Sequence, residues 1–260
     1  MKTRSHSELG SVEKSFVLLR LLASESKRGL GLTSLAKLSG LPHPTVHRLL
    51  QKLIAERIVF QIESDKRYVL GSLAFELGLA ASRFYDLREF CRDTLINLAN
   101  EVEDTVYLTV RSGYEAVCLD RYEGPSPIRV FTLEVGSRRP LGVGAGGLAI
   151  LAFLPKEELL EVVQSLKENP CSLDLVGKHF IRDLLESILA TQKNRYALIR
   201  QRVNLGVSAI GIPILDSFLR PIAAVSVAAV DSRMPSARVK SLMLALQRAA
   251  SDIQGVLKGR

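Results

Sequence analysis

The sequence predicts an α+β protein of two domains, a small helical domain followed by a larger domain built on an antiparallel sheet. Apolar residues recur at the three- and four-residue spacing of helices through the first quarter of the chain, whereas from Thr105 they alternate with polar residues as in strands. The 260 residues, 47% hydrophobic and 24% charged, suffice for a core in each domain. We therefore expect a first domain over residues 9–71, a linker helix over 72–85 and a second domain over 86–260.

Two helices open the first domain. Residues 11–24 carry apolar side chains at helical spacing, so a helix is expected there with Ser11 as its N-cap. A second, shorter helix is expected to begin with Thr33 as its N-cap and to bury Leu35 and Leu38.

A tight turn, Gly40-Leu41-Pro42, separates the second helix from a third. Gly40 stands where the chain needs a left-handed conformation after a helix end, while Pro42 and Pro44 fit only the first turn of the next helix. One face of the third helix is expected to be buried, formed by Val46, Leu49, Leu50, Leu53 and Ile54. Two amphipathic helices around such a turn are typical of a helix-turn-helix.

The polar face of the third helix is the candidate surface for base and phosphate contacts, because Arg48 and Gln51 have the chemistry for bidentate contacts to base edges. The alternative is a polar face that is merely solvated, but the three-helix context favours a DNA-binding role. The candidate DNA-binding residues, including flanking polar groups, are Thr33, His43, Thr45, His47, Arg48, Gln51 and Lys52.

A β-hairpin is expected next, because residues 58–62 and 67–70 alternate apolar and polar side chains around a charged tip. The third helix would be the recognition helix, which contacts the bases, and a hairpin beside such a helix is called a wing. Lys66 and Arg67 are candidates for contact with a phosphate or the minor groove. The alternative is that these charges only keep an exposed hairpin tip soluble.

The positive charge of the chain is concentrated in this first domain. Residues 1–70 hold 12 Lys and Arg against six Asp and Glu, whereas residues 71–260 hold 23 against 21. A basic patch on one small domain is typical of polyanion binding, since each neutralised phosphate releases counterions.

The second domain is expected to combine helices with paired strands. Helical spacing over residues 72–85 and 86–102 predicts two linker helices, whose apolar faces pack either within the chain or between subunits. Antiparallel strands are expected from Thr105 to Arg111 and around Val117 to Leu119. Further strands are predicted over 128–135, 195–202, 208–216 and 222–230, and further helices over 144–153, 156–167, 181–193 and 237–257.

Four segments resemble the IclR family of bacterial transcriptional regulators: LTSLAKLSGLPHPTVHRLLQKL (32–53), RYVLG (67–71), RPLGVGAGGLAIL (139–151) and RYALIRQRVNLGVSAIGIPI (195–214). A departure is Arg57, where the family usually has glycine. The resemblance implies a winged helix-turn-helix that binds double-stranded operator DNA and a GAF-like domain that binds a small effector, often a carboxylate. It also implies a linker that pairs subunits, so we expect a homodimer, or a tetramer of two dimers.

The glycine cluster at residues 142–147 does not fit a dinucleotide-binding fingerprint, because no buried strand precedes it and no βαβ unit surrounds it. Two interpretations remain open. The glycines let the backbone approach an anionic ligand at a helix N-terminus, or they let a helix pack closely on a sheet. The family usually carries His, Ser or Thr, and Lys where Gly142, Gly144 and Gly147 stand here.

The resemblance also places the effector pocket. The stretch at residues 199–202 is Ile-Arg-Gln-Arg where the family has acidic residues, and guanidinium groups suit an anionic effector. The alternative is that Arg195, Arg200 and Arg202 form surface ion pairs. The candidate effector residues are Leu141, Gly144, Ala145, Ile199, Arg200, Ala209 and Ser226. Ile199 and Ala209 make the predicted pocket more apolar, which favours an aromatic acid over a two- or three-carbon keto acid.

The sequence lacks the residue patterns that several classes of enzyme and metal-binding protein require. No Ser/His/Asp set, HExxH motif or Cys/His metal spacing is present, so no enzyme activity, catalytic residue, metal or cofactor is expected. Three scattered cysteines and the absence of a signal sequence or membrane span predict a cytoplasmic protein without membrane contact. The alternative function is an architectural or effector-independent DNA-binding protein whose second domain only oligomerises.

Overall fold

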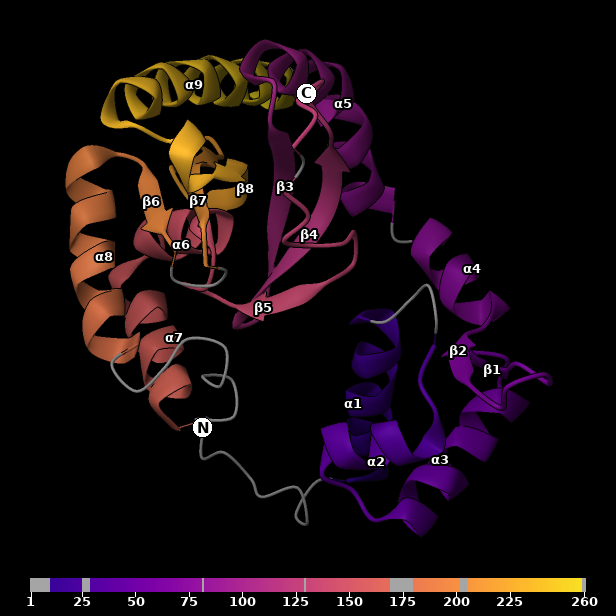
Figure 1. Ribbon diagram of the computed structural model, residues 1–260. Helices are drawn as coiled ribbons and strands as arrows, with labels where there is room; N and C mark the ends of the chain where they lie inside the picture. Colours follow the sequence, from indigo (N-terminus) through magenta and orange to yellow (C-terminus); the bar gives the residue numbers. More distant parts are fainter. Residues whose placement is uncertain are drawn as a thin grey trace. The chain divides into compact units, whose positions relative to one another are not determined.

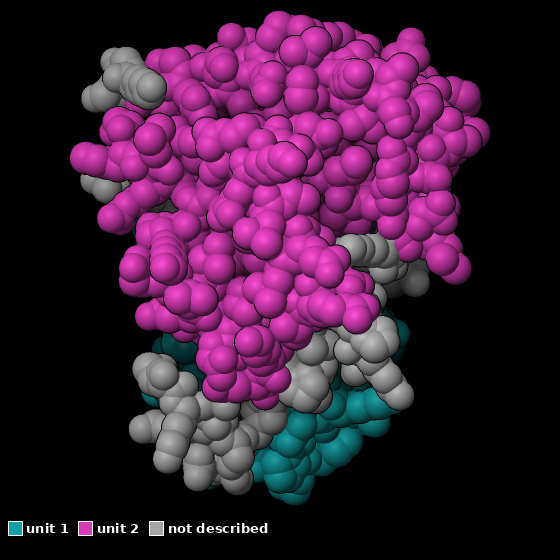
Figure 2. Space-filling model, turned by 90° about the vertical axis from the view of Figure 1, so that its left-hand side faces the viewer, with its two compact units in different colours: residues 1–86 teal, residues 87–260 magenta. Residues whose placement is uncertain are grey.

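The computed structural model describes residues 10–24, 29–80, 82–128, 130–168, 180–201 and 205–258 (Figure 1). The chain forms two compact units, residues 1–86 and 87–260, which are coloured separately in Figure 2. In the part of the chain that is described, no helix has the length and apolar character needed to cross a membrane.

Unit 1 contains three helices, a two-stranded antiparallel hairpin and a fourth helix (Figure 1). The predicted helix-turn-helix and wing are therefore present in the structure. The elements are α1 (Ser11–Ser24), α2 (Leu32–Ser39), α3 (His43–Ala55), β1 (Val59–Gln61), β2 (Tyr68–Leu70) and α4 (Ser72–Ala80). A core of apolar side chains holds α1, α2, α3 and the hairpin together: Leu18, Leu22, Leu35, Val46, Leu49, Leu50, Val59 and Tyr68.

Three details of this unit differ from the sequence prediction. Ser11 lies within α1, and the Glu13 carboxylate instead accepts the Gly10 N–H at 2.7 Å. Thr33 lies inside α2, whose N-cap is Gly31 without a side-chain bond. Leu38 is 58% exposed, because the buried stripe of α2 runs through Leu35, Ala36 and Ser39.

Unit 2 is a six-stranded antiparallel sheet in the order β5-β4-β3-β8-β7-β6, covered by helices on both faces (Figure 1). The α+β prediction is therefore confirmed. The strands are β3 (Thr105–Ser112), β4 (Glu115–Tyr122), β5 (Arg138–Pro140), β6 (Ala197–Arg200), β7 (Val207–Leu215) and β8 (Pro221–Val230). The helices are α5 (Ser82–Val102), α6 (Ala145–Ala152), α7 (Lys156–Glu168), α8 (Phe180–Asn194) and α9 (Ser236–Lys258), with a short 3-10 turn, η2 (Asp231–Arg233).

Period-two alternation along the strands gives the sheet two different faces. Large aliphatic side chains such as Leu108, Ile210 and Val225 pack against α5 and α9. The opposite face is built from small side chains such as Ala116 and Ala224; α6 and α8 pack against it, and α7 packs against α8. Small residues on this second face let α6 lie close to the sheet.

The predicted strand over residues 128–135 is wrong, and the sheet instead gains β5. We call the described part of that segment, residues 130–135, the strap. Side chains, not a neighbouring strand, bind its backbone: the Tyr107 hydroxyl donates to the Val130 carbonyl at 2.8 Å and accepts the Thr132 N–H at 3.1 Å. The Arg121 guanidinium donates to the Leu133 carbonyl at 3.3 Å.

A polar network joins α5 to β4. Arg88 Nε donates to Asp120 Oδ2 at 2.7 Å, and the Tyr122 hydroxyl donates to the same oxygen at 2.7 Å. Burial alone would raise the pKa of Asp120, but these bonds and the Arg121 N–H lower it. A depressed folded-state pKa means that Asp120 stabilises the fold above pH about 4 and loses this contribution as the pH falls.

We expect Asp120→Asn to lower the free energy of unfolding at pH 7 by about 1–2 kcal/mol. The loss is smaller than for a fully buried pair, because the Arg88 side chain is 47% exposed and solvent screens it. Urea unfolding at pH 7 and at about pH 3 measures the effect, with exposed Asp93→Asn on α5 as the control. The free energies of unfolding of wild type and Asp120→Asn should differ less at low pH than at pH 7. An equally large difference at both pH values would contradict this account.

Candidate nucleic-acid interface and ligand pocket

The turn between α2 and α3 fixes the direction of α3. Gly40 adopts φ 66°, the left-handed conformation predicted for it, and Leu41 is buried. The Ser39 hydroxyl donates to the Leu35 carbonyl at 2.6 Å and accepts the Leu41 N–H at 3.3 Å. The Pro42 carbonyl accepts the N–H groups of Thr45 and Val46, which starts α3. Local hydrogen bonds therefore hold the turn rigidly.

The polar face of α3 is accessible and cationic. His43, His47, Arg48, Gln51 and Lys52 are exposed and Thr45 is half-buried, whereas Val46, Leu49 and Leu50 on the other face are buried. Within the described residues, no side chain of this polar set has a hydrogen bond or ion pair with the rest of the chain. These donors are therefore available to a ligand outside the chain. Thr33, on α2, is also exposed.

The two candidate residues of the wing differ in their surroundings. Arg67 Nη1 donates to the Gly29 carbonyl at 3.1 Å, and its Nε lies 3.6 Å from Asp65 Oδ2. Arg67 thus helps to hold the wing against the unit. Lys66 lies at the exposed tip with φ 58°, and among the described residues its ammonium has no partner.

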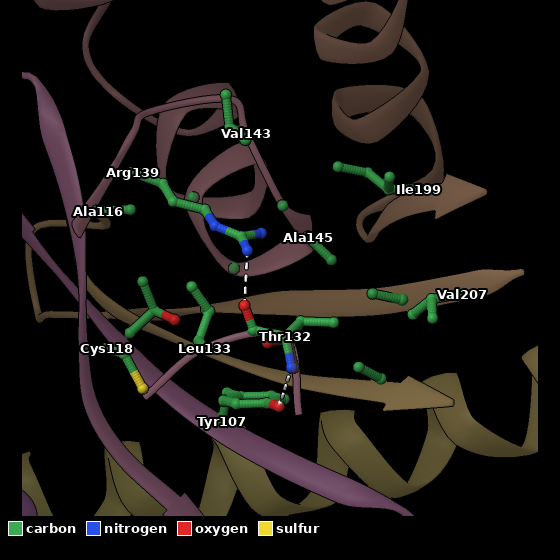
Figure 3. A pocket seen from close by; sticks show the side chains of 17 residues that line it. Tyr107, Ala116, Cys118, Thr132, Leu133, Arg139, Val143, Ala145, Ile199 and Val207 are labelled. Atoms are coloured by element: carbon green, nitrogen blue, oxygen red, sulfur yellow. Dashed lines mark hydrogen bonds between the residues drawn. The ribbon is translucent and has the colours of Figure 1, made fainter. Parts of the chain in front are cut away.

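A cavity of about 50 Å³ lies on the small-residue face of the unit 2 sheet, between the sheet, the start of α6 and the strap (Figure 3). Apolar side chains such as Val143, Ile199 and Ala209 form most of its wall. Its polar lining groups belong to Tyr107, Thr109, Cys118, Thr132, Arg139 and Ser226. Burial raises the pKa of Cys118 to about 12, so its thiol is neutral at pH 7.

Arg139 is the cation of this pocket. Its guanidinium points across the cavity toward the strap, where Nη2 donates to the Thr132 carbonyl at 2.6 Å (Figure 3). Among the described residues no carboxylate pairs with it. Burial lowers the pKa of Arg139, but a guanidinium stays charged at neutral pH. A partly buried charge with free donors is a ready receptor for an anion.

The glycine cluster allows α6 to begin directly beside the sheet. Gly142 and Gly144 have φ 91° and 87°, which side chains disfavour, and Gly144 is the N-cap of α6 without a side-chain bond. A Cβ on Gly211 of β7 would lie 2.8 Å from the Ala145 backbone, so helix and sheet are in close contact. Within the cluster, a Cβ on Gly146 would lie 2.6 Å from Thr109 Oγ1 and one on Gly147 would lie 3.1 Å from Ala116 Cβ, so close packing of α6 on the sheet is one role of these glycines.

Comparison with known proteins places both units in one family. The sequence model of the IclR helix-turn-helix domain matches residues 11–63, and that of the bacterial transcriptional regulator IclR C-terminal domain matches residues 80–255. The chain belongs to the IclR family. IclR proteins are DNA-binding transcriptional regulators and not enzymes.

IclR relatives match over nearly the whole chain. The HTH-type transcriptional regulator KipR of Bacillus subtilis is 30% identical over 246 residues, which cover 94% of this chain and 95% of KipR. The transcriptional repressor IclR of Escherichia coli is 26% identical over 250 residues, which cover 95% of this chain and 89% of that protein.

Solved IclR structures share the fold. A family member from Brucella abortus is 19% identical with a TM-score of 0.75, covering 98% of this chain and 95% of that one. An IclR homologue from Microbacterium hydrocarbonoxydans, solved in complex with 4-hydroxybenzoate, is 21% identical with a TM-score of 0.73. The match covers 96% of this chain and 100% of that one.

Five of the seven candidate effector residues line the pocket: Gly144, Ala145, Ile199, Ala209 and Ser226. Two do not. Leu141 is fully buried in the core beneath α6. Arg200 faces away, with Nη1 3.5 Å from Asp231 Oδ1 and 3.1 Å from the Met234 carbonyl, so the ion-pair alternative holds for it.

Arg195, another arginine of this stretch, is not among the residues that line the pocket. The Arg195 guanidinium stacks over the Phe153 ring at 4.8 Å, and Arg202 lies outside the described residues.

Arg139 and Thr109 line the pocket although neither was among the predicted residues. A signal for Arg139 was present in the sequence, since it directly precedes Pro140 at the start of the glycine loop. Thr109 lies two residues after Tyr107 on β3, and strand alternation places both on the same face of the sheet.

Proposed function

We propose that this IclR-family regulator binds a specific operator through α3 and that a small organic acid in the unit 2 pocket changes its operator affinity. The observation that carries the effector part is Arg139, a guanidinium in the pocket without a carboxylate partner among the described residues. The IclR homologue solved with 4-hydroxybenzoate, an organic acid, supports the same ligand class.

For DNA, we propose that α3 enters the major groove. Arg48 and Gln51 contact base edges, while Thr45, His47 and Lys52 contact bases or phosphates. Thr33 and His43 lie near the backbone of the duplex, and Lys66 of the wing reaches an adjacent phosphate. Arg67 supports the wing, and its exposed guanidinium edge adds positive charge beside it.

For assembly, we propose a homodimer, or a tetramer of two dimers, paired through α4. No residue of α4 is buried, and Phe75, Leu77 and Leu79 are 65%, 53% and 57% exposed. Exposed apolar side chains on one helix suit a partner surface. A dimer would bring two α3 helices to one operator, in the cytoplasm where the DNA lies.

An operator shift assay tests this function. Operator fragments are selected from genomic DNA with the full chain, and the dissociation constant is measured with and without a panel of aliphatic and aromatic acids. The proposal requires that at least one acid changes the constant by about 5- to 150-fold. Selective DNA binding that no acid alters would instead support an effector-independent, architectural role.

Lys52→Ala is expected to weaken binding to all DNA sequences alike, because an ammonium contacts phosphate as a point charge. The slope of log K against log salt should flatten by about 0.9, the value of one lost phosphate contact. Titrations at several salt concentrations measure the slope, and Lys193→Ala on α8 is the matched control. An unchanged slope would remove Lys52 from the interface.

A further inference from the structure

Besides Arg139, the pocket has a second site that suits an anion, and it consists of two hydroxyl groups. Thr109 on β3 and Ser226 on β8 line the cavity and are only 3% and 6% exposed. Within the part of the chain that the structure describes, neither hydroxyl forms a hydrogen bond, and both oxygens open into the cavity. Hydroxyl groups that face a cavity without a partner in the chain are available to a ligand.

The two hydroxyls converge beside the first turn of α6. A Cβ on Gly146 would lie 2.6 Å from Thr109 Oγ1 and 3.4 Å from Ser226 Oγ, so both oxygens lie next to the Gly146 backbone. α6 begins at Ala145, its N-cap Gly144 provides no side-chain bond, and its first N–H groups have no acceptor in the described chain. Two hydroxyl donors, free N–H groups and the positive end of a helix together suit a carboxylate.

Arg139, on β5, is the first anion-binding group of the pocket, and the two hydroxyls are the second. The Arg139 guanidinium donates a hydrogen bond to the Thr132 carbonyl (Figure 3). None of the residues that line the cavity is acidic, so nothing in the lining repels negative charge. Between the polar groups the wall is apolar, with Ala116, Val143 and Ala145. Such a wall suits a short hydrocarbon segment.

The cavity volume favours a short ligand. A buried water needs roughly 10–15 Å³ on this scale, so a cavity of about 50 Å³ holds about four water molecules. Their liquid volume, about 30 Å³ each, corresponds to a molecule of three or four carbons with its oxygens. An aromatic acid, which the apolar Ile199 and Ala209 favour, is the alternative ligand.

We propose that the effector is a short aliphatic dicarboxylic acid. One carboxylate binds Arg139, and the other binds the Thr109 and Ser226 hydroxyls and the N–H groups that open α6. This inference rests on the proposed function, because it specifies the ligand of the same regulatory pocket.

Calorimetric titration of the full-length protein tests the inference with matched probes: malonate against propionate, succinate against butyrate, and benzoate. The dicarboxylate of each pair should bind at least about tenfold more tightly, since it gains charge-assisted bonds at the second receptor. Equal affinities within each pair, or tightest binding by benzoate, would overturn the inference. Measurements on the wild-type protein are sufficient for this test.

Variants then locate the second receptor. The Thr109→Val, Ser226→Ala double variant should lose about tenfold in dicarboxylate affinity and leave propionate and butyrate unchanged. Thr94→Val on α5 is the control for loss of a hydroxyl outside the pocket. A double variant that keeps its preference for dicarboxylates would contradict the assignment of Thr109 and Ser226.

The outcomes separate this inference from the proposed function. If monocarboxylates bind and alter operator affinity while dicarboxylates bind no better, the inference fails and the acid-controlled regulator stands. If no probe binds and operator affinity never changes, both fail.

Discussion

Arg48→Ala is expected to raise the operator dissociation constant by roughly 5- to 150-fold, or about 1–3 kcal/mol, and to remove base preference at one position of each half-site. The guanidinium lies exposed on the polar face of α3, and no acidic group among the described residues competes for it. Because Val46 and Leu49 anchor the opposite face, the substitution should not disturb the helix.

Binding to a set of operators with single-base changes measures this effect. Wild type should discriminate at the contacted position, whereas Arg48→Ala should bind all four bases there with similar affinity. Arg220→Ala, at an exposed site of unit 2, controls for a loss of one positive charge. If Arg48→Ala binds the operator as tightly and selectively as wild type, α3 does not read bases through this residue.

Arg139→Met is expected to weaken the response to acids strongly while preserving operator binding in their absence. Hydrogen bonds to a charged group contribute about 1.5–3 kcal/mol, so acid affinity should fall by roughly 10- to 150-fold. Methionine retains much of the apolar stem, and the main loss is the charged group with its bond to the Thr132 carbonyl.

Arg200→Ala is the matched comparison for this prediction. Arg200 carries the same charge in the same unit, but it pairs with Asp231 outside the pocket. Acid titrations should therefore give wild-type affinity for Arg200→Ala and weak binding for Arg139→Met. If Arg200→Ala binds acids weakly and Arg139→Met binds them as wild type does, the effector binds at the β6 end of the sheet.

The elements that the sequence predicted well are those fixed by local interactions. The helix-turn-helix depends on apolar spacing within each helix and on Gly40, whose left-handed backbone forms the turn between α2 and α3. Most strands and helices of unit 2 were predicted because their alternation or helical spacing continues over many residues. The errors in unit 1, at Thr33 and Leu38, concern single positions near the ends of a short helix.

The parts that failed depend on residues distant in the sequence. The strap alternates apolar and polar side chains like a strand, but the Tyr107 hydroxyl, more than 20 residues earlier, binds its backbone. Arg200 was assigned to the pocket from its position in the family pattern, and its partner Asp231, 31 residues away, could not be inferred from spacing. Arg139 was missed for the same reason, since only the position of the strap directs it into the cavity.

The most direct test of acid-controlled DNA binding is the operator dissociation constant of the full chain, measured with and without saturating succinate. The account predicts that the constant changes by about 5- to 150-fold in wild type and by much less in Arg139→Met. Succinate that binds the wild-type protein in calorimetry yet leaves the operator dissociation constant unchanged would contradict it.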